Sequence, residues 1–364
     1  MSPLQQNALN IFTQYNSPYQ WAETKNSLGI AYFKRIKEKR AKNIDSAIEC
    51  FQNALIIYTQ QNFPYEWAMT QNNLGNAYVD KTIGNKRENI EKAIKYYQNA
   101  LIVRTPQNSP AECSRTANYL GNLYFREENW QSAVDTYTTA IEAIENIRLK
   151  SLSDDRRQEI MDEAITVYAN MVQACVELGQ LQTAIEYAER SRCRRLVDLM
   201  ESNRIYNDDN IPQEVAEYLK KYRSIQQQID TESQRLKNDG SQSKLAISGA
   251  ARGNRDSYET TIETIARLET EKQQVWQQIR SFDKLLSEQI QVEHISFDTI
   301  RQLIPDDNTA MICCYTTSTK LQIFVVFKDR PVQLHPTDLN PQQLKEFGSA
   351  SWFNPSGTPF LPPC

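Results

Sequence analysis

The sequence predicts a mainly α-helical protein: a superhelical solenoid of paired helices, then a long helical hairpin, then a short β-hairpin. Three observations predict it: a motif that returns every 46 residues, an apolar residue at every seventh position further on, and a continuous apolar run near residue 324. A repeat of 20 to 50 residues is typical of a stacked array, in which each unit packs against its neighbours. Such arrays mostly bind other molecules, so the repeat favours a binding protein over a self-contained enzyme.

The repeats occupy residues 1–203 and predict an array of about four units. The motif W-A-x-T-x-N-x-L-G-x-A-Y begins at Trp21 and again at Trp67, and a looser copy, T-x-N-x-L-G-x-x-Y, begins at Thr116. Within a unit, spacings of three and four place the apolar residues on one face of each helix. The small residues of the motif let two helices approach closely, and the aromatic residues fill the remaining space.

This pattern resembles the tetratricopeptide repeat (TPR), with L-G-x-x-Y on its first helix and A-x-x-x-F-x-x-A on its second. Units at 28–54, 74–100 and 120–140 match, with tyrosine for phenylalanine in the last two. The 46-residue spacing resembles the longer repeats of kinesin light chain. Ala8 corresponds to Ala54, the end of a second helix, so we expect the chain to begin partway through a repeat.

Residues 211–292 predict an antiparallel, coiled-coil-like helical hairpin. Val215, Tyr222 and Ile229 recur every seven residues, and a second apolar series, interrupted by Lys272, surrounds Ile279. A Gly-, Ser- and Asn-rich stretch between the two series predicts the connecting loop.

Residues 296–338 predict strands at Ala310–Tyr315 and Leu321–Phe327, with a candidate third at Val332–His335. The second strand is apolar at nearly every position, which is typical of a strand covered on both faces. Residues 339–364 are rich in proline and predict a disordered tail.

The order of these elements, with E-R-S-R-x-R-x-L-x-D-L from Glu189, resembles bacterial proteins that join a TPR array to a CHAT domain, a caspase- and separase-like cysteine peptidase fold. The resemblance implies that residues 296–338 are the first strands of a CHAT domain that is cut off. The catalytic His and Cys of that family follow these strands.

No catalytic or cofactor site is predicted within the chain. His294 and His335 do not fit the His of the CHAT family, and Cys313 and Cys314 are expected to be packing residues of a strand. We therefore expect a protein that is not an enzyme and that needs no cofactor or metal. The alternative is the regulatory part of a CHAT peptidase whose catalytic residues lie beyond the end of this chain.

A column of asparagines is the candidate binding surface, because asparagine is a poor helix former and yet recurs at one position of successive repeats. The resemblance implies that the first helices line a concave groove, where amides can donate to and accept from an extended peptide. Basic side chains nearby could anchor acidic residues of a partner. The candidate residues are Asn26, Asn72, Asn76, Asn118, Asn122, Lys34, Arg115 and Arg126. The competing interpretation is that the asparagines are solvated or hydrogen-bond between helices.

Charge and composition narrow the partners to a protein or peptide. The formal net charge of -4 provides no basic footprint for nucleic acid, and the cluster of arginines at 190–195 is expected to be a solvated helix face. No apolar run is long enough to cross a membrane, and no signal peptide is visible, so we expect a cytoplasmic location. Self-association through residues 211–292 is a further possibility.

Overall fold

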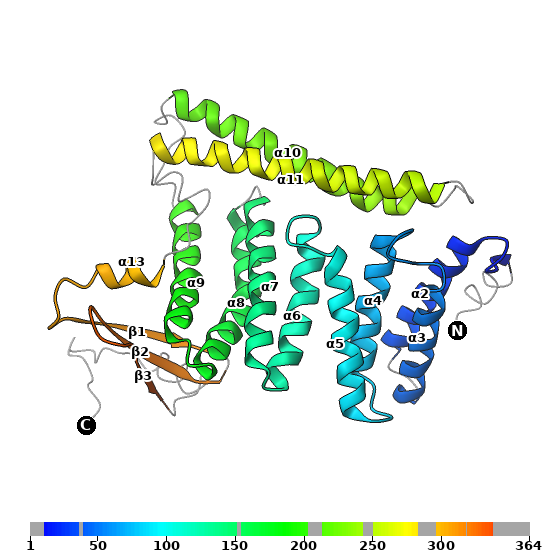
Figure 1. Ribbon diagram of the computed structural model, residues 1–364, viewed down its shortest axis with the longest axis horizontal. Coiled ribbons are helices and arrows are strands. Elements are labelled where there is room, and N and C mark those ends of the chain that lie inside the picture. The colour runs from blue at the N-terminus through cyan, green and yellow to red at the C-terminus, as the bar shows by residue number, and fades with distance from the viewer. Residues whose placement is uncertain are drawn as a thin grey trace, which may run out of the picture.

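The computed structural model describes residues 11–35, 39–150, 154–202, 213–242, 250–282, 296–317 and 319–337. The expectations for the chain start, for His294 and for the tail at 339–364 lie outside these ranges. The described chain is mostly helical, as predicted, with a small antiparallel sheet at its C-terminal end (Figure 1).

Eight helices form the array. They are α2 (Pro18–Lys34), α3 (Arg40–Ala54), α4 (Pro64–Val79), α5 (Lys86–Val103), α6 (Pro110–Arg126), α7 (Trp130–Lys150), α8 (Asp154–Glu177) and α9 (Leu181–Ser202). Consecutive helices pack against one another along the row in Figure 1, so the solenoid is confirmed.

A proline begins the first helix of each of the first three repeats. Pro18, Pro64 and Pro110 occupy the first turn of α2, α4 and α6. Proline fits there because its fixed φ suits a helix and its missing N–H would have no partner within the helix. The recurrent prolines therefore set where each repeat starts.

The array has a hydrophobic core that continues into the sheet. A single cluster of buried residues extends from Ile44 in the first repeat through Leu74, Tyr137 and Val172 to Phe324 in the sheet. The sheet and the repeats are therefore joined by packing as well as by the chain.

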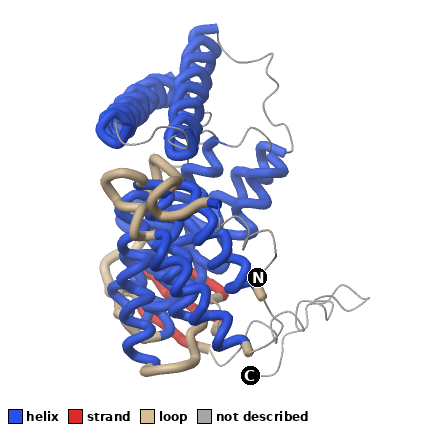
Figure 2. Tube along the Cα trace, turned by 90° about the vertical axis from the view of Figure 1, so that its right-hand side faces the viewer, coloured by secondary structure: helices blue, strands red, loops and turns tan. Residues whose placement is uncertain are grey.

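Helices α10 (Gln213–Gln242) and α11 (Ala250–Phe282) form the predicted hairpin, which lies along one edge of the array, where α10 approaches α4 (Figures 1 and 2). Val215, Tyr222, Ile229 and Ile279 are buried in a cluster separate from that of the array. The hairpin is confirmed, while a supercoiled geometry stays a prediction.

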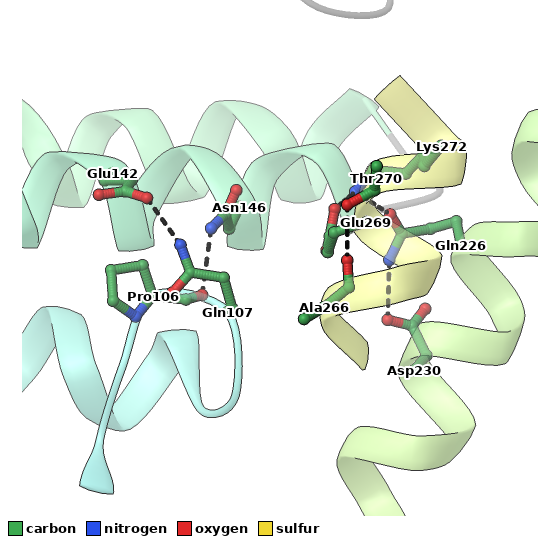
Figure 3. Close-up of polar contacts among 10 residues, drawn as sticks. All are labelled: Pro106, Gln107, Glu142, Asn146, Gln226, Asp230, Ala266, Glu269, Thr270 and Lys272. Carbon is green, nitrogen blue, oxygen red and sulfur yellow. Dashed lines mark hydrogen bonds and ion pairs between the residues drawn. The ribbon is translucent and has the colours of Figure 1, made fainter. Parts of the chain in front are cut away.

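A polar layer interrupts this apolar seam. Lys272 is buried, its Nζ donates to Gln226 Oε1 at 3.1 Å, and it lies 2.5 Å from Glu269. Gln226 Nε2 in turn donates to Asp230 Oδ1 at 3.0 Å, as the right half of Figure 3 shows. The left half shows the loop before α6 held to α7, where Gln107 donates to Glu142. Each charged group in the hairpin layer thus has a polar neighbour, as burial demands.

The short helix α13 (Phe297–Gln302) precedes a sheet of three antiparallel strands, β1 (Ala310–Thr316), β2 (Leu321–Phe327) and β3 (Gln333–Pro336), in the order β1-β2-β3. The third strand extends the predicted hairpin. In β2, Phe324 and Val326 are fully buried, while the alternate residues are only half-buried. The expectation that β2 is covered on both faces is therefore wrong for the described residues: the core covers one face.

Polar contacts fasten the sheet to the last two array helices. Gln173 Oε1 on α8 accepts from Thr317 Oγ1 at 2.8 Å and from Gln322 Nε2 at 3.1 Å. On α9, Glu189 Oε1 accepts from the thiol of Cys313, and Arg192 lies over the ring of Tyr315.

The expectation that the arginines at 190–195 form a solvated helix face is wrong for the two whose side chains are described. Arg190 pairs with the mostly buried Glu145 through Nη2 at 2.5 Å, and Arg192 contacts the sheet. Both side chains therefore have structural roles.

Candidate functional site

The candidate site begins with a close approach between the two helices of a repeat. A Cβ on Gly75 would lie 2.6 Å from the ring of Tyr97, and one on Gly121 would lie 2.6 Å from the ring of Tyr137. Real Cβ contacts are longer, so glycine at these positions lets the aromatic ring of the second helix pass against the first. The ring then ends near the residue that follows each glycine.

That following residue is asparagine in the second and third repeats. Tyr97 donates its hydroxyl to Asn76 Oδ1 at 2.7 Å, and Tyr137 donates to Asn122 Oδ1 at 2.7 Å. Burial raises the pKa of both tyrosines, so the hydroxyls stay protonated and remain donors. Each amide oxygen of Asn76 and Asn122 thus accepts a hydrogen bond from a tyrosine, and the amide nitrogen of each asparagine can donate to another group.

Asn122 has further partners in the same layer. Its Oδ1 also accepts from Asn170 Nδ2 at 3.1 Å, and its own Nδ2 donates to Asn118 Oδ1 at 3.1 Å. One N–H of its amide group is then used within the helix, and the second remains.

The first column of asparagines lies deeper, between repeats. Thr70 donates to Asn26 Oδ1 at 3.3 Å, and Thr116 donates to Asn72 Oδ1 at 3.0 Å. Asn26 is 4% exposed and Asn72 is 9% exposed. Placing these two amides on the groove surface was therefore a wrong expectation, and the inter-helix interpretation holds for them. The threonine that recurs two residues before each asparagine was the available signal.

A pocket of about 320 Å³ opens on the first helices of the array. Its lining includes three of the eight predicted residues, namely Asn76, Asn122 and Arg126. The other lining residues, which sequence reasoning missed, are Phe33, Val79, Asp80, Tyr97, Tyr119 and Leu123. Lys34, at the end of α2, and Arg115, on α6, are exposed but do not line it.

The two charged side chains at the pocket, Asp80 and Arg126, differ in whether they already have an ionic partner. Asp80 pairs with Arg40 at 2.7 Å, so its carboxylate is partly neutralised. Arg126 is exposed, and it forms no salt bridge within 4.0 Å to any described residue. Each of the two amide oxygens already accepts from a tyrosine, and the amide nitrogens and Arg126 add donors above an apolar wall. The pocket suits a ligand that brings hydrogen-bond acceptors.

Within the described ranges, no group of three or more metal-ligating side chains occurs, and no helix is long and apolar enough to cross a membrane. Cys314 and His335 both pair with Ile323, from β1 and β3 respectively, so a strand lies between them. Strands are spaced about 4.8 Å apart, so the two backbones lie roughly 10 Å apart.

The paired helices and the donor-lined pocket define a helical-repeat protein of the kind that serves as an interaction scaffold. Residues 2–226, well over half of the chain, match the family model of the soluble NSF attachment protein, SNAP. The chain therefore belongs to that family, whose fold is a TPR-like superhelix of α-helical repeats. A search of curated proteins gave no match. The predicted TPR-like kind of repeat is confirmed, whereas the resemblance to CHAT proteins is not.

Proposed function

We propose that the chain is a protein-interaction scaffold, non-catalytic as it stands, that holds an extended segment of a partner protein at the pocket formed by α2, α4, α5 and α6. The observation that carries this proposal is the orientation of the two amides, whose oxygens are occupied by Tyr97 and Tyr137. The amide nitrogen of Asn76 and one N–H of the Asn122 amide are then left for a ligand.

The chemistry of the pocket indicates which part of a partner it would bind. Peptide carbonyls and carboxylates are acceptors, and a guanidinium such as that of Arg126 binds carboxylates strongly. Tyr119, 43% exposed, and Val79, 37% exposed, add apolar area against which a partner side chain can pack. An extended segment with an apolar residue beside an acidic one fits both features.

The family also supports a protein partner. Its TPR-like repeat fold generally mediates protein interactions, and the acidic chain offers no field that would draw nucleic acid. A cytoplasmic location, which remains an expectation, agrees with such a role.

The test is peptide selection followed by binding measurements. Peptides selected from a random display library against the full chain would be measured by fluorescence anisotropy against the triple variant Asn76→Ala, Asn122→Ala, Arg126→Ala. We expect at least about tenfold weaker binding, since each lost charged or amide contact costs roughly 0.5–3 kcal/mol.

The matched control replaces an arginine and an asparagine outside the pocket, Arg115→Ala and Asn62→Ala. Binding should be retained in this control, and circular dichroism should show both variants folded. Equal binding by the triple variant and the wild type would disprove the pocket as the binding site.

A second candidate, the regulatory part of a CHAT-type cysteine peptidase, is favoured by one observation: β2 carries apolar side chains on both faces, as a central strand of a larger sheet would. On our proposal the chain by itself should not react with an electrophilic ketone probe for cysteine peptidases. Stoichiometric, pH-dependent labelling of one cysteine by that probe would instead favour the peptidase.

A further inference from the structure

The sheet has one face packed on the array and one face without a described cover. Cys313 and Tyr315 of β1 are buried against α9, whereas Ile312 is 67% exposed. Ile312 pairs with Val325 of β2, and Cys314 pairs with Ile323, so these four side chains share the open face. An apolar sheet face of this kind marks an interaction surface.

The two edges of the sheet differ in how they resist further pairing. β3 is four residues long and ends in Pro336, features that protect an edge. β1 is seven residues long, A-M-I-C-C-Y-T, with no charge, no proline and no glycine. No backbone hydrogen bond of β1 other than those to β2 occurs among the described residues. The edge of β1 is therefore an open template for another strand.

We propose that β1 pairs antiparallel with β1 of a second copy of this chain, around a two-fold axis near Cys313. Such pairing would place Ile312 of each copy opposite Cys314 of the partner subunit, so the two open faces would join into one apolar surface. Strands usually avoid pairing with themselves because like charges would meet, and β1 has none.

Self-pairing is favoured over pairing with a different protein because a second copy offers the same uncharged, seven-residue strand with one edge unpaired among the described residues. Two identical strands pair in a two-fold arrangement, which is the commonest symmetry of soluble oligomers. A single seven-residue pair buries a modest area, so the dimer should be reversible and concentration-dependent.

The test is sedimentation velocity on the full chain over a wide concentration range, with Ile312→Lys as the variant. A lysine at each side of the axis puts like charges together, and we expect the dissociation constant to rise by at least about tenfold. The control is Ile102→Lys, which alters an isoleucine of similar exposure on the array, 57% against 67%. The control should dimerise as the wild type does.

A short bismaleimide provides a second readout, in a background in which Cys193 and Cys364 are replaced by serine. It should link two chains of this background through Cys314, which is exposed, whereas Cys313 is buried and burial raises the pKa of its thiol to about 12. The cross-linked dimer should be lost in both Cys314→Ser and Ile312→Lys.

Three outcomes would overturn the proposal. The first is a chain that stays monomeric at every concentration, which would leave the edge to a different protein. The second is a dimer that Ile312→Lys does not weaken, which would point instead to the hairpin of α10 and α11. The third is a cross-link that survives Cys314→Ser.

Discussion

The array and the helical hairpin solve the same packing problem in different ways. The array packs a glycine or alanine of one helix against an aromatic ring of the next, and the tyrosine hydroxyl at the end of the ring reaches an asparagine at the surface. The hairpin packs aliphatic residues along a seam and interrupts them with one buried lysine. The Tyr97–Asn76 pair thus lies at the margin of the array core, whereas Lys272 and Gln226 lie within the hairpin seam.

The difference shows which interaction determines the helix packing in each region. In the array, the size of one side chain fixes how closely two helices approach, and polar groups face a possible ligand. In the hairpin, polar partners must align across two helices, so they specify the register of the pair. The array should therefore be most sensitive to volume, and the hairpin to the loss of a polar partner.

The largest effect should come from adding one methyl group to the array. Gly75→Ala places a Cβ about 2.6 Å from the ring of Tyr97, so the ring or the helix backbone must shift to accommodate it. We expect a loss of about 1–3 kcal/mol in the free energy of unfolding, measured by urea denaturation with circular dichroism.

The control for this prediction is a double variant. Adding Tyr97→Leu should relieve the clash, so Gly75→Ala should cost less in that background than in the wild type. Additive effects of the two changes would contradict the proposed contact.

In the hairpin, removing a hydrogen-bond partner of Lys272 should lower the free energy of unfolding more than removing the charge of Lys272 itself. Gln226→Leu takes away an acceptor that the buried Lys272 uses but leaves its contact with Glu269, so we expect a loss of about 1 kcal/mol in the free energy of unfolding. Lys272→Met keeps the volume and removes the ammonium, so the hairpin should be equally stable or more stable.

Thermal unfolding of the two hairpin variants can be followed by the part of the tryptophan fluorescence that Trp276→Phe removes, because Trp276 is 2% exposed in the same seam and the chain has four other tryptophans. A Lys272→Met variant that is less stable than Gln226→Leu would show that the ion pair with Glu269 dominates the polar layer.

A similar or smaller effect should distinguish the first repeat from the next two. At the position of Asn76 the first repeat has Ile30, and at the position of Tyr97 it has Phe51, so the amide and the hydroxyl are absent together. Tyr97→Phe should cost about 0.5–1.5 kcal/mol, because Asn76 loses a donor but remains half-buried beside water.

The matching experiment moves the pair into the first repeat. Phe51→Tyr alone should destabilise the array, because its hydroxyl would find no acceptor at Ile30. Adding Ile30→Asn should restore part of that loss in chemical denaturation. A Phe51→Tyr variant as stable as the wild type would argue against the pairing rule.

The fold could be predicted from the sequence because its signals are local and repeated. The 46-residue spacing, the small-to-aromatic pattern and the continuous apolar run near residue 324 each specify an element directly. The fourth repeat departs from the pattern: Val172 on α8 replaces the glycine, and Ala188 on α9 replaces the aromatic residue. The larger side chain therefore lies on the first helix of this repeat instead of the second, and both positions stay buried.

The site could be predicted only in part, because recurrence in the sequence does not distinguish an exposed amide from a buried one. Asn72 and Asn76 both recur, yet one hydrogen-bonds to the next repeat and the other lines the pocket. The packing of the sheet on α8 and α9 was also missed, since Gln173 and Thr317 are 144 residues apart and carry no shared motif. Contacts of that range depend on the whole fold.

Repeat arrays need a terminal element that closes their last exposed helix pair. Here the sheet serves as that cap, since Phe324 and Val326 complete the core that begins in the first repeat. A helical cap would leave a curved surface at this end of the protein. A β-sheet cap instead leaves a flat face and a strand edge. A partner at this end of the protein would therefore add a strand to the sheet, whereas a partner of a helical cap would pack a helix against it.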